Sequence, residues 1–428
     1  MGSETEARSA DSASHQSKDL EKEVAVLITD MAQYSRRTAE MRPEQIRDFI
    51  IHYHENLGRI IAMSPDDPID LEPSAGDASV VLFEAKPGET GHEKCVRALQ
   101  AAVRIAEAVM EKKLPETRVG IFAGDIIEAR VGRQTLKFGN SFAAASRLEE
   151  LCDYFGTHIL MDRDVAQAQT KDAEYIVSIG KLTPKNFLHP IHAYSIYMPG
   201  IHQLPYNIDK KGLLEYVKTK NQAMDFFSGN ELRAIRPNFE IARDKLRQAA
   251  ELFAEVAGQD DQASLRILGF ISEHPYPTED FVREGMVIDA HKGDYRFGVR
   301  LLHLSQQLFK AMDYEFYQAL VVDTDWEQYF RLEWHEKGER VIKIGEDPNG
   351  VYYIDRGEAQ VLNDEGKVIA SLRNGDVFGE MAYFTEEGTR TASVVAVTDL
   401  VVRKILNEDF ANFPTLQAIF KKIAQKRL

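Results

Sequence analysis

The sequence predicts a multidomain α+β protein: an α/β sandwich, then a helical middle region, then a C-terminal β jelly roll with flanking helices. Three observations predict this order. β-Branched runs alternate with amphipathic helical patterns in the first half, helical apolar spacing replaces strand signals after residue 210, and short strands separated by glycine turns follow. We expect a disordered tail, a sandwich domain, a helical linker or transducer domain and a jelly-roll domain at residues 1–20, 21–198, 199–325 and 326–428.

The composition is that of an ordinary globular protein, and the net charge argues against nucleic acids and anionic membranes as partners. The 428 residues suggest two or three domains, and 44% of them are hydrophobic and 28% charged. A net charge of −16 argues against nucleic acid and anionic membrane surfaces as partners. Cys95 and Cys152 lie too far apart for a metal-ligand spacing and form no disulfide framework, which fits a reducing cytoplasm. No apolar run is long enough to span a membrane, and the N-terminal tail lacks the apolar centre of a signal peptide.

The first half contains the pattern of a central buried strand followed by alternating helices and strands. The β-branched run at residues 24–30 ends in the carboxylate of Asp30, and a tight turn around Gly76 and Asp77 leads into the next strand. The remaining predicted elements are a strand at 79–83, helices at 43–61, 92–112 and 142–151, and a strand pair at 118–124 and 126–132.

Asp30 and Asp77 are candidate metal ligands. Both follow or precede predicted strands, and Mg²⁺ binds few protein carboxylates together with substrate phosphates. The simpler alternative is that Asp30 caps a helix and Asp77 is a turn residue. The spacing alone does not distinguish the two interpretations.

Residues 22–198 resemble the catalytic domains of class III adenylate and guanylate cyclases. The segment Val26-Leu27-Ile28-Thr29-Asp30-Met31-Ala32-Gln33-Tyr34-Ser35 is similar to the first metal motif of that family, and Gly76-Asp77 to the second. The segment from Gly139 to Leu148 is similar to the one that carries base-recognition and transition-state residues. The resemblance implies Mg²⁺ or Mn²⁺ at Asp30 and Asp77, a nucleoside triphosphate ligand, and transition-state stabilisation by Arg147.

The departures from the family pattern point to a silent or very slow domain. The position of the adenine-reading Lys is Pro73, the acidic base-reading position is Asn140, and the transition-state Asn is replaced by Ala143. Loss of one such electrostatic donor costs about 10²–10³ in rate. In the family the two half-sites face each other across a head-to-tail dimer, so a homodimer of this chain cannot supply the missing groups. Arg147 then has an alternative role as a helix-surface charge paired with Glu149, Glu150 or Asp153.

The sequence of the middle region predicts helices. Proline and glycine at residues 199–205 end the first domain, and helical spacing follows at 213–227, 237–257, 260–273 and 296–313. His291 and His303 have no ligand-like partners and are expected to be ordinary helical residues. The region is either a transducer between the terminal domains or a spacer.

A segment near the end of the chain predicts a pocket for a cyclic nucleotide phosphate. Gly379 and Ala382 leave room for backbone amides to approach a phosphate, and the guanidinium of Arg390 can meet two phosphate oxygens at once. Glu380 is then placed to accept a hydrogen bond from a ribose hydroxyl. The flanking sequence predicts short strands at residues 338–342, 350–357, 359–362 and 368–372, as in a small antiparallel barrel or jelly roll.

Residues 331–413 resemble the cyclic-nucleotide-binding domain of bacterial cyclic AMP receptor proteins and kinase regulatory subunits. The resemblance implies that Glu380 binds the ribose 2′-hydroxyl and that Arg390 binds the phosphate. It further implies that Gly379, Met381 and Ala382 line the phosphate turn. Thr391 and Ala392, which follow Arg390, are the remaining expected ligand-binding residues. The alternative is a jelly roll that kept its shape and lost its ligand. The Thr391 hydroxyl could serve a guanine amino group, but small hydroxyl residues also occur in cyclic AMP binders, so cyclic AMP is favoured over cyclic GMP.

The sequence therefore supports two hypotheses for a cytoplasmic bacterial signalling protein. In the first, cyclic nucleotide binds the C-terminal pocket and the helical middle relays the change to a silent cyclase-like domain, which forms a homodimer or binds a protein partner. In the second, the N-terminal domain is an active cyclase whose product is sensed at the C-terminus. The short tail after Phe410 is too short for a helix-turn-helix domain, which argues against a transcription factor.

Overall fold

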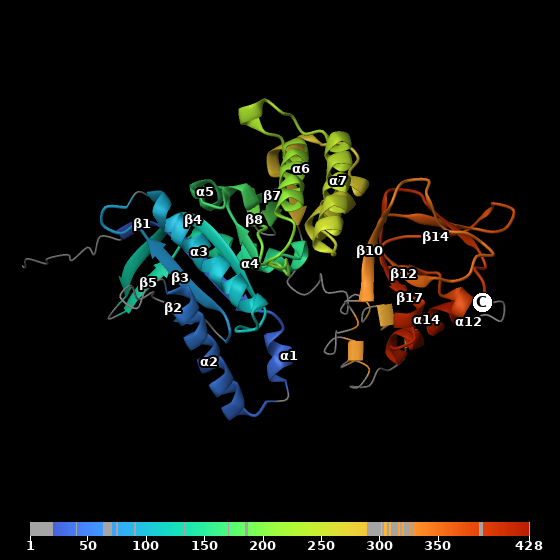
Figure 1. Cartoon of the computed structure of the whole chain (residues 1–428), viewed down its shortest axis with the longest axis horizontal. Coiled ribbons are helices and arrows are strands. Elements are labelled where there is room, and N and C mark those ends of the chain that lie inside the picture. Colours follow the sequence, from blue (N-terminus) through green and yellow to red (C-terminus); the bar gives the residue numbers. More distant parts are fainter. Residues whose placement is uncertain are drawn as a thin grey trace, which may run out of the picture.

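The computed structural model contains a mixed α/β part, a helical part and a β-rich C-terminal part (Figure 1). It describes residues 20–39, 41–62, 71–73, 76–89, 91–131, 134–169, 171–184, 187–288, 329–384 and 388–427, with isolated positions between 301 and 326. Residues 1–19 of the tail expected at 1–20, most of the expected helix at 296–313, His291 and His303 lie outside the described residues, while Leu20 begins β1. The expected α+β fold class, with C-terminal antiparallel sheets, is confirmed.

A single mixed sheet forms the centre of the N-terminal part. Its strands follow the order β2-β3-β1-β4-β6-β8-β7-β9, with β5 paired to β4. In chain order they are β1 Leu20–Met31, β2 Leu71–Pro73, β3 Ser79–Glu84, β4 Thr117–Val131, β5 Gln134–Phe138, β6 Ile159–Met161, β7 Ile176–Pro184, β8 Ile191–Ile196 and β9 Met286–Ile288. The β1 strand is central because antiparallel ladders to β3 and β4 satisfy both of its edges.

The expected strand pair at 118–124 and 126–132 is wrong, because β4 is one continuous strand. Asp125 does not turn the chain and pairs with Glu23 of β1, next to the pair formed by Gly124 and Val24. Gly124 has a packing role instead: a Cβ there would lie 2.7 Å from the Ser141 hydroxyl. The strand that does pair with the second half of β4 is β5.

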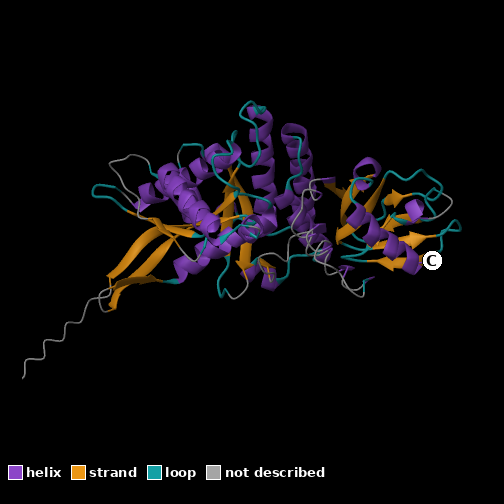
Figure 2. Ribbon diagram, turned by 90° about the horizontal axis from the view of Figure 1, so that it is seen from below, coloured by secondary structure: helices purple, strands orange, loops and turns teal. Residues whose placement is uncertain are grey.

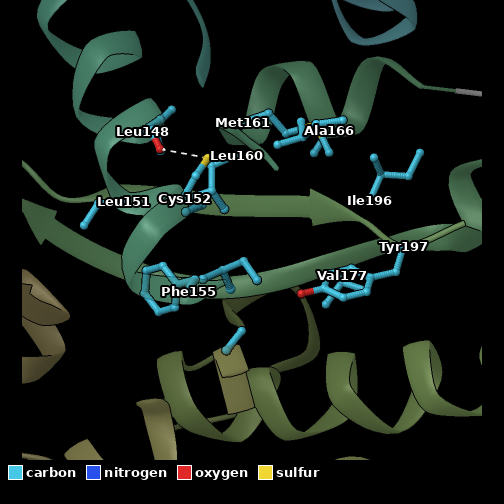
Figure 3. Close-up of a cluster of buried hydrophobic side chains, with 14 of the residues drawn as sticks. Leu148, Leu151, Cys152, Phe155, Leu160, Met161, Ala166, Val177, Ile196 and Tyr197 are labelled. Atoms are coloured by element: carbon cyan, nitrogen blue, oxygen red, sulfur yellow. Dashed lines mark hydrogen bonds between the residues drawn. The ribbon is translucent and has the colours of Figure 1, made fainter. Parts of the chain in front are cut away.

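Helices pack on the sheet, and their apolar side chains form a buried core with those of the strands. Cys152 and Phe155 of α4 pack with Met161 of β6, Val177 of β7 and Tyr197 in an apolar cluster (Figure 3). Both cysteine thiols of the chain are buried and free. The helices of this part are α1 Tyr34–Thr38, α2 Pro43–Ile61, α3 Gly91–Met110, α4 Asn140–Phe155 and α5 Arg163–Ala168, with a 3-10 turn at Ala173–Tyr175.

The helical part continues the same core and the same sheet. Phe227 of α6, Phe253 of α7 and Ile267 of α8 belong to the apolar cluster that begins at Ala25 of β1. After α9 the chain returns as β9, which pairs in parallel with β7 and becomes an edge of the sheet. The helices are α6 Lys210–Ser228, α7 Phe239–Ala257, α8 Gln262–Glu273 and α9 Glu279–Glu284, with a 3-10 turn at Glu231–Arg233. Each of the four helices begins with an Asp, Asn or Thr side chain that caps it.

The C-terminal part is built from two four-stranded antiparallel sheets (Figure 2). One has the order β10-β17-β12-β15 and the other β11-β16-β13-β14. Their bounds are β10 Phe330–His335, β11 Arg340–Ile342, β12 Gly350–Arg356, β13 Ala359–Leu362, β14 Val368–Leu372, β15 Val377–Phe378, β16 Ser393–Ala396 and β17 Leu400–Leu406. Among the described residues, the helices that follow β15 and β17 are α12 Met381–Phe384, α13 Asn407–Phe410 and α14 Pro414–Arg427. Within the described residues, no helix is long and apolar enough to cross a membrane.

Candidate functional site

A cavity of about 410 Å³ lies in the C-terminal part, within the range of small-molecule sites. The sheet that contains β11, β13, β14 and β16 supplies an apolar wall, with Ile342, Val361, Leu372 and Val394 among its lining side chains. The β15–α12 turn, Arg390 and the end of α14 supply the polar wall. This cavity therefore suits a ligand with a flat, largely apolar part and an anionic part.

Gly379 makes the turn between β15 and α12 possible. Its φ is +84°, which disfavours any residue with a Cβ, and a Cβ would lie 2.8 Å from the Arg390 guanidinium. The predicted site residues Met381, Ala382, Thr391 and Ala392 all line the same cavity. The structure thus brings together every residue that the sequence assigned to the cyclic nucleotide.

The Arg390 guanidinium lies at the polar end of the cavity. It donates to the carbonyl oxygens of Gly379 at 2.7 Å and Gly350 at 2.8 Å, and to the Asn349 side chain at 3.0 Å. The residue is 4% exposed, and burial lowers the pKa of its guanidinium. Since these three hydrogen bonds all go to neutral oxygens, a phosphate is a favourable further partner for the buried cation.

Glu380 is fully buried beneath the last turn of α14. Its Oε1 accepts a hydrogen bond from Arg427 at 2.6 Å, while its Oε2 has no hydrogen-bond partner among the described residues. Burial raises the pKa of the Glu380 carboxyl, and the Arg427 charge opposes that shift. Since an unpaired buried carboxylate oxygen costs free energy, Glu380 is ready to accept a hydroxyl donor.

Arg427 and Asn349 contact the candidate site, and the sequence did not identify them. The basic residues near the C-terminus suggested only the positive end of a helix, but Arg427 lies over Glu380 and also donates to the Val377 carbonyl at 2.8 Å. No sequence signal links Arg427 to Glu380, because the contact depends on how α14 folds back over the cavity.

A second candidate site lies where β1 ends. Asp77 is 7% exposed and accepts a hydrogen bond from the Met31 amide at 3.0 Å, which holds its carboxylate beside Asp30. Burial, and next the negative charge of Asp30, raise the pKa of Asp77 to about 6. A divalent cation would relieve this repulsion, so the two carboxylates fit a metal.

Any such cation would need ligands from outside the protein. The described residues contain no group of three or more His, Cys, Asp and Glu side chains suited to a metal. The remaining positions would belong to water and to substrate phosphates, as is usual for Mg²⁺.

Arg147 lies on α4, which packs on the same face of the sheet that Asp30 occupies. Ala145 of α4 contacts Val24 and Val26, and Asp30 shares their parity along β1. In this structure the Arg147 guanidinium forms an ion pair with Glu150, one of the partners expected for a surface charge. Asp153, another of the expected partners, pairs with Arg118 instead.

Three positions depart from the cyclase pattern, and two of them, Pro73 and Ala143, have side chains without hydrogen-bonding groups. Pro73 ends β2, while Asn140 and Ala143 are exposed in the first turn of α4. Ala143 has no hydrogen-bonding side chain, and proline has no donor at all. The second site therefore keeps the two candidate carboxylates, while Pro73 and Ala143 supply no side-chain donor.

The family model described as "Cyclic nucleotide-binding domain" matches residues 332–414, which contain the whole of the β15–α12 turn and Arg390. Residues 332–414 are a cyclic nucleotide-binding domain. Except for Arg427 of α14, the residues that line the cavity lie within this match.

Curated relatives are similar to this chain over short stretches. A cAMP-dependent protein kinase regulatory subunit from Yarrowia lipolytica is 38% identical over 76 residues, or 18% of this chain and 20% of the relative. The potassium voltage-gated channel unc-103 of Caenorhabditis elegans is 30% identical over 100 residues, or 23% of this chain and 12% of the channel. The chain therefore spans a fifth or less of the length of these relatives.

Solved structures of two kinds are similar to the chain. The adenylyl cyclase CyaB from P. aeruginosa has 18% identity and a TM-score of 0.37, covering 42% of this chain and 97% of that one. The Thermus thermophilus catabolite activator protein has 25% identity and a TM-score of 0.23, covering 28% of this chain and 57% of that one.

Proposed function

We propose that the chain is a cytoplasmic cyclic-nucleotide receptor. The cyclic nucleotide-binding domain takes cyclic AMP in preference to cyclic GMP, and the helical part relays binding to the α/β domain. That domain is catalytically silent and serves as a dimerisation or protein-partner platform. The observation that carries the proposal is the buried Arg390 at the polar end of a cavity whose other wall is apolar. Equilibrium binding of labelled cyclic AMP, with cyclic GMP as competitor, tests both the receptor and its preference.

A single strand supports the relay. The Gly350 carbonyl at the start of β12 accepts from Arg390, and Asp355 near its end is bonded by Arg266 of α8 at 2.9 Å and by Arg403 of β17 at 2.9 Å. Reorientation of Arg390 toward a phosphate would remove a bond from one end of β12. The other end of the same strand is anchored to the helical part.

The contact continues into the α/β domain. The Arg266 guanidinium also donates to the backbone carbonyl of Tyr154 on α4 at 3.1 Å, and Arg356 donates to the Tyr154 hydroxyl at 3.2 Å. Because α4 carries Arg147, a shift of Tyr154 reaches the helix beside the carboxylate pair. This continuous set of contacts is the physical basis we propose for the relay.

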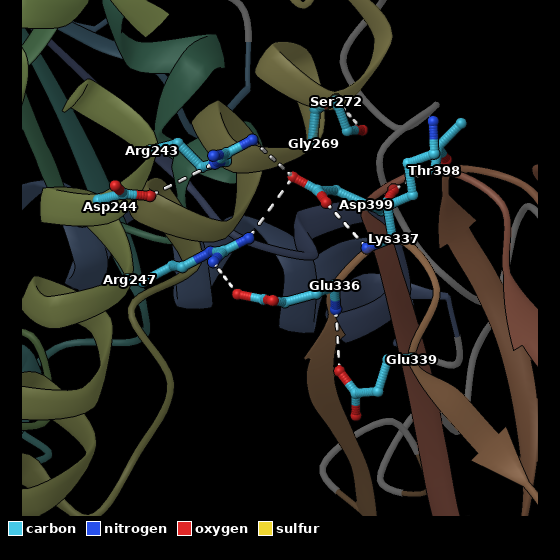
Figure 4. Close-up of polar contacts among 10 residues, drawn as sticks. All are labelled: Arg243, Asp244, Arg247, Gly269, Ser272, Glu336, Lys337, Glu339, Thr398 and Asp399. Atoms are coloured by element: carbon cyan, nitrogen blue, oxygen red, sulfur yellow. Dashed lines mark hydrogen bonds and ion pairs between the residues drawn. The ribbon is translucent and has the colours of Figure 1, made fainter. Parts of the chain in front are cut away.

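Charged contacts also join the domain to α7 (Figure 4). Arg247 pairs with Asp399 at 3.6 Å and with Glu336, and its guanidinium lies 3.5 Å from the ring centroid of Trp334. Arg243 reaches the same Asp399 carboxylate at 3.9 Å. These charged contacts accompany an apolar one, because Leu332 of β10 and Val401 of β17 belong to the same buried cluster as the core of the helical part.

The relay predicts that Asp355→Asn tightens cyclic AMP binding by about fivefold or more, the lower end of typical coupling between sites. In this structure Asp355 bonds to Arg266 while Arg390 donates to protein oxygens, so the Asp355 contact stabilises the ligand-free arrangement. Weakening that contact should therefore favour the ligand-bound arrangement. Isothermal titration measures the affinity, with Asp364→Asn on an exposed turn of the same domain as the matched control. Equal affinity in Asp355→Asn and in the unaltered chain would refute a relay through β12.

The alternative function is an active nucleotide cyclase, favoured by the placement of Asp77 beside Asp30. We expect no cyclic product above background from ATP or GTP with Mg²⁺ or Mn²⁺, with or without added cyclic nucleotide, because Ala143 and Pro73 supply no donors. Mass spectrometry of the reaction mixture measures the product. A cyclic product that disappears in Asp30→Ala would replace the receptor hypothesis with a product-sensing cyclase.

A further inference from the structure

A second and larger cavity lies where the three parts of the chain meet. Its volume is about 840 Å³, compared with about 410 Å³ for the cavity at Arg390. Arg118 of β4 and Asp153 of α4 line it from the α/β domain, Phe253 from α7, and Arg331 of β10 and Arg403 of β17 from the cyclic nucleotide-binding domain. We call this cavity the junction cleft. Neither candidate site described above includes any residue that lines it.

Unpartnered polar atoms are concentrated in the side chains around the junction cleft. Among the described residues, buried atoms without a hydrogen-bond partner include Arg118 Nη1, Asp153 Oδ2, His158 Nδ1 and His202 Nε2, all from residues that line the cleft. Arg118, His158 and His202 are 8%, 9% and 7% exposed. Each such atom costs about 1–3 kcal/mol unless something binds it, so this concentration in one place points to a ligand.

The existing hydrogen bonds of the cleft residues show which of their remaining atoms are donors and which are acceptors for a ligand. His202 Nδ1 accepts from the His158 amide at 3.1 Å, so the proton of the neutral ring lies on Nε2. Burial lowers the pKa of His202 well below its usual value, which keeps the ring neutral. His202 Nε2 and Arg118 Nη1 are therefore donors, and Asp153 Oδ2 is an acceptor. A ligand must present both acceptors and a donor within a short span, as the edge of a purine base does.

Aromatic rings form one wall of the same cleft. The ring centroids of His158 and His202 are 5.3 Å apart, those of Tyr197 and His202 are 5.0 Å apart, and those of Tyr197 and Phe253 are 5.7 Å apart. Rings of this kind stack on nucleobases. At the edge of the cleft Arg331 is exposed and lies near the Asp260 carboxylate, whereas Arg403 forms an ion pair with Asp355, so Arg331 is the more accessible cation for a phosphate.

We propose that the junction cleft binds a non-cyclic purine nucleotide. Its base contacts the aromatic wall and hydrogen-bonds to the Arg118–Asp153 pair and His202, and its phosphates bind Arg331 at the edge. Because the walls come from all three parts, the bound nucleotide holds the cyclic nucleotide-binding domain against the α/β domain. The site is independent of cyclic nucleotide binding at Arg390, and so of the proposed receptor function.

The test uses the full chain carrying Arg390→Ala and Asp30→Ala, which removes binding at the other two sites. AMP, GMP, ATP and GTP are titrated calorimetrically. We expect at least one of them to bind, and Arg331→Glu to weaken it about tenfold or more, the effect of losing one charge-assisted bond. Arg331 is exposed, so this variant should fold normally.

His202→Ala should weaken the same nucleotide, whereas His189→Ala, at an exposed histidine outside the cleft, should not. Absence of binding of all four nucleotides at millimolar concentration overturns the proposal, as does binding that Arg331→Glu leaves unchanged. Cyclic AMP binding by the unaltered chain, measured separately, reports on the receptor function alone.

Discussion

Arg390→Ala lowers the affinity for cyclic AMP and cyclic GMP by about 10²-fold or more, in effect abolishing binding. A bidentate guanidinium–phosphate contact comprises two charge-assisted hydrogen bonds, each contributing about 1.5–3 kcal/mol, and together they correspond to 10²–10⁴ in affinity. The phosphate would otherwise enter a buried site without a compensating charge. Equilibrium binding of a fluorescent cyclic nucleotide measures the loss.

Two controls separate binding from folding. Arg390→Lys keeps the charge but cannot form a bidentate contact, so it should retain only part of the affinity. Arg373→Ala removes an exposed arginine of the same domain and should bind as the unaltered chain does. Since Arg390 also satisfies the Gly379 and Gly350 carbonyls, the thermal midpoint of each variant must be compared. A folded Arg390→Ala variant with unchanged affinity would remove the assignment of this cavity.

Asp261→Ala lowers the free energy of unfolding by about 3–5 kcal/mol, the usual result of leaving one partner of a buried ion pair alone. Both Asp261 and Lys220 have side chains that are 0% exposed, with Nζ–O distances of 2.9 and 2.7 Å. Asp261 also accepts from the Tyr216 hydroxyl at 3.0 Å and from the Ser264 amide at 3.1 Å, which caps α8. Burial opposes ionisation of Asp261, but Lys220 outweighs it and lowers the pKa of the carboxyl.

Urea denaturation followed by circular dichroism measures this loss. Asp244→Ala, at an exposed acidic residue on α7, should change stability by less than about 0.5 kcal/mol. The double variant Lys220→Met/Asp261→Leu should recover only part of the loss. It removes the unpaired Lys220 charge, but it leaves the Tyr216 hydroxyl and the Ser264 amide without their acceptor. A loss below about 1 kcal/mol in Asp261→Ala would mean that water reaches the pair.

Local patterns were sufficient to predict many elements of the fold. The helix at 43–61 begins and ends as its apolar spacing indicated, since that spacing alone determines which face can be buried. The error at Asp125 arose because Gly-Asp resembles a turn when its neighbours are not considered, whereas here the glycine makes room for α4.

The cyclic nucleotide cavity was predictable because its key residues lie close together in sequence. Gly379, Glu380 and Arg390 lie on one short segment, so their sequence spacing is enough to predict that their side chains meet. Arg427 and the junction cleft were not predictable, because they depend on contacts between segments far apart in the chain. The Arg403–Asp355 and Arg266–Asp355 pairs are of the same kind, and no local pattern reports them.

The pairing of β9 with β7 has a consequence for how the chain unfolds. Because β9 completes the sheet and one apolar core includes residues from Ala25 to Ile288, with Leu332 and Val401 of the C-terminal part at its margin, the α/β and helical parts share most of the interactions that protect each of them. They therefore form one cooperative unit whose amides should exchange with solvent at comparable rates. In the proposed relay the helical part is therefore a structural component of the α/β platform, so a displacement of α8 by the cyclic nucleotide-binding domain would act on that platform directly.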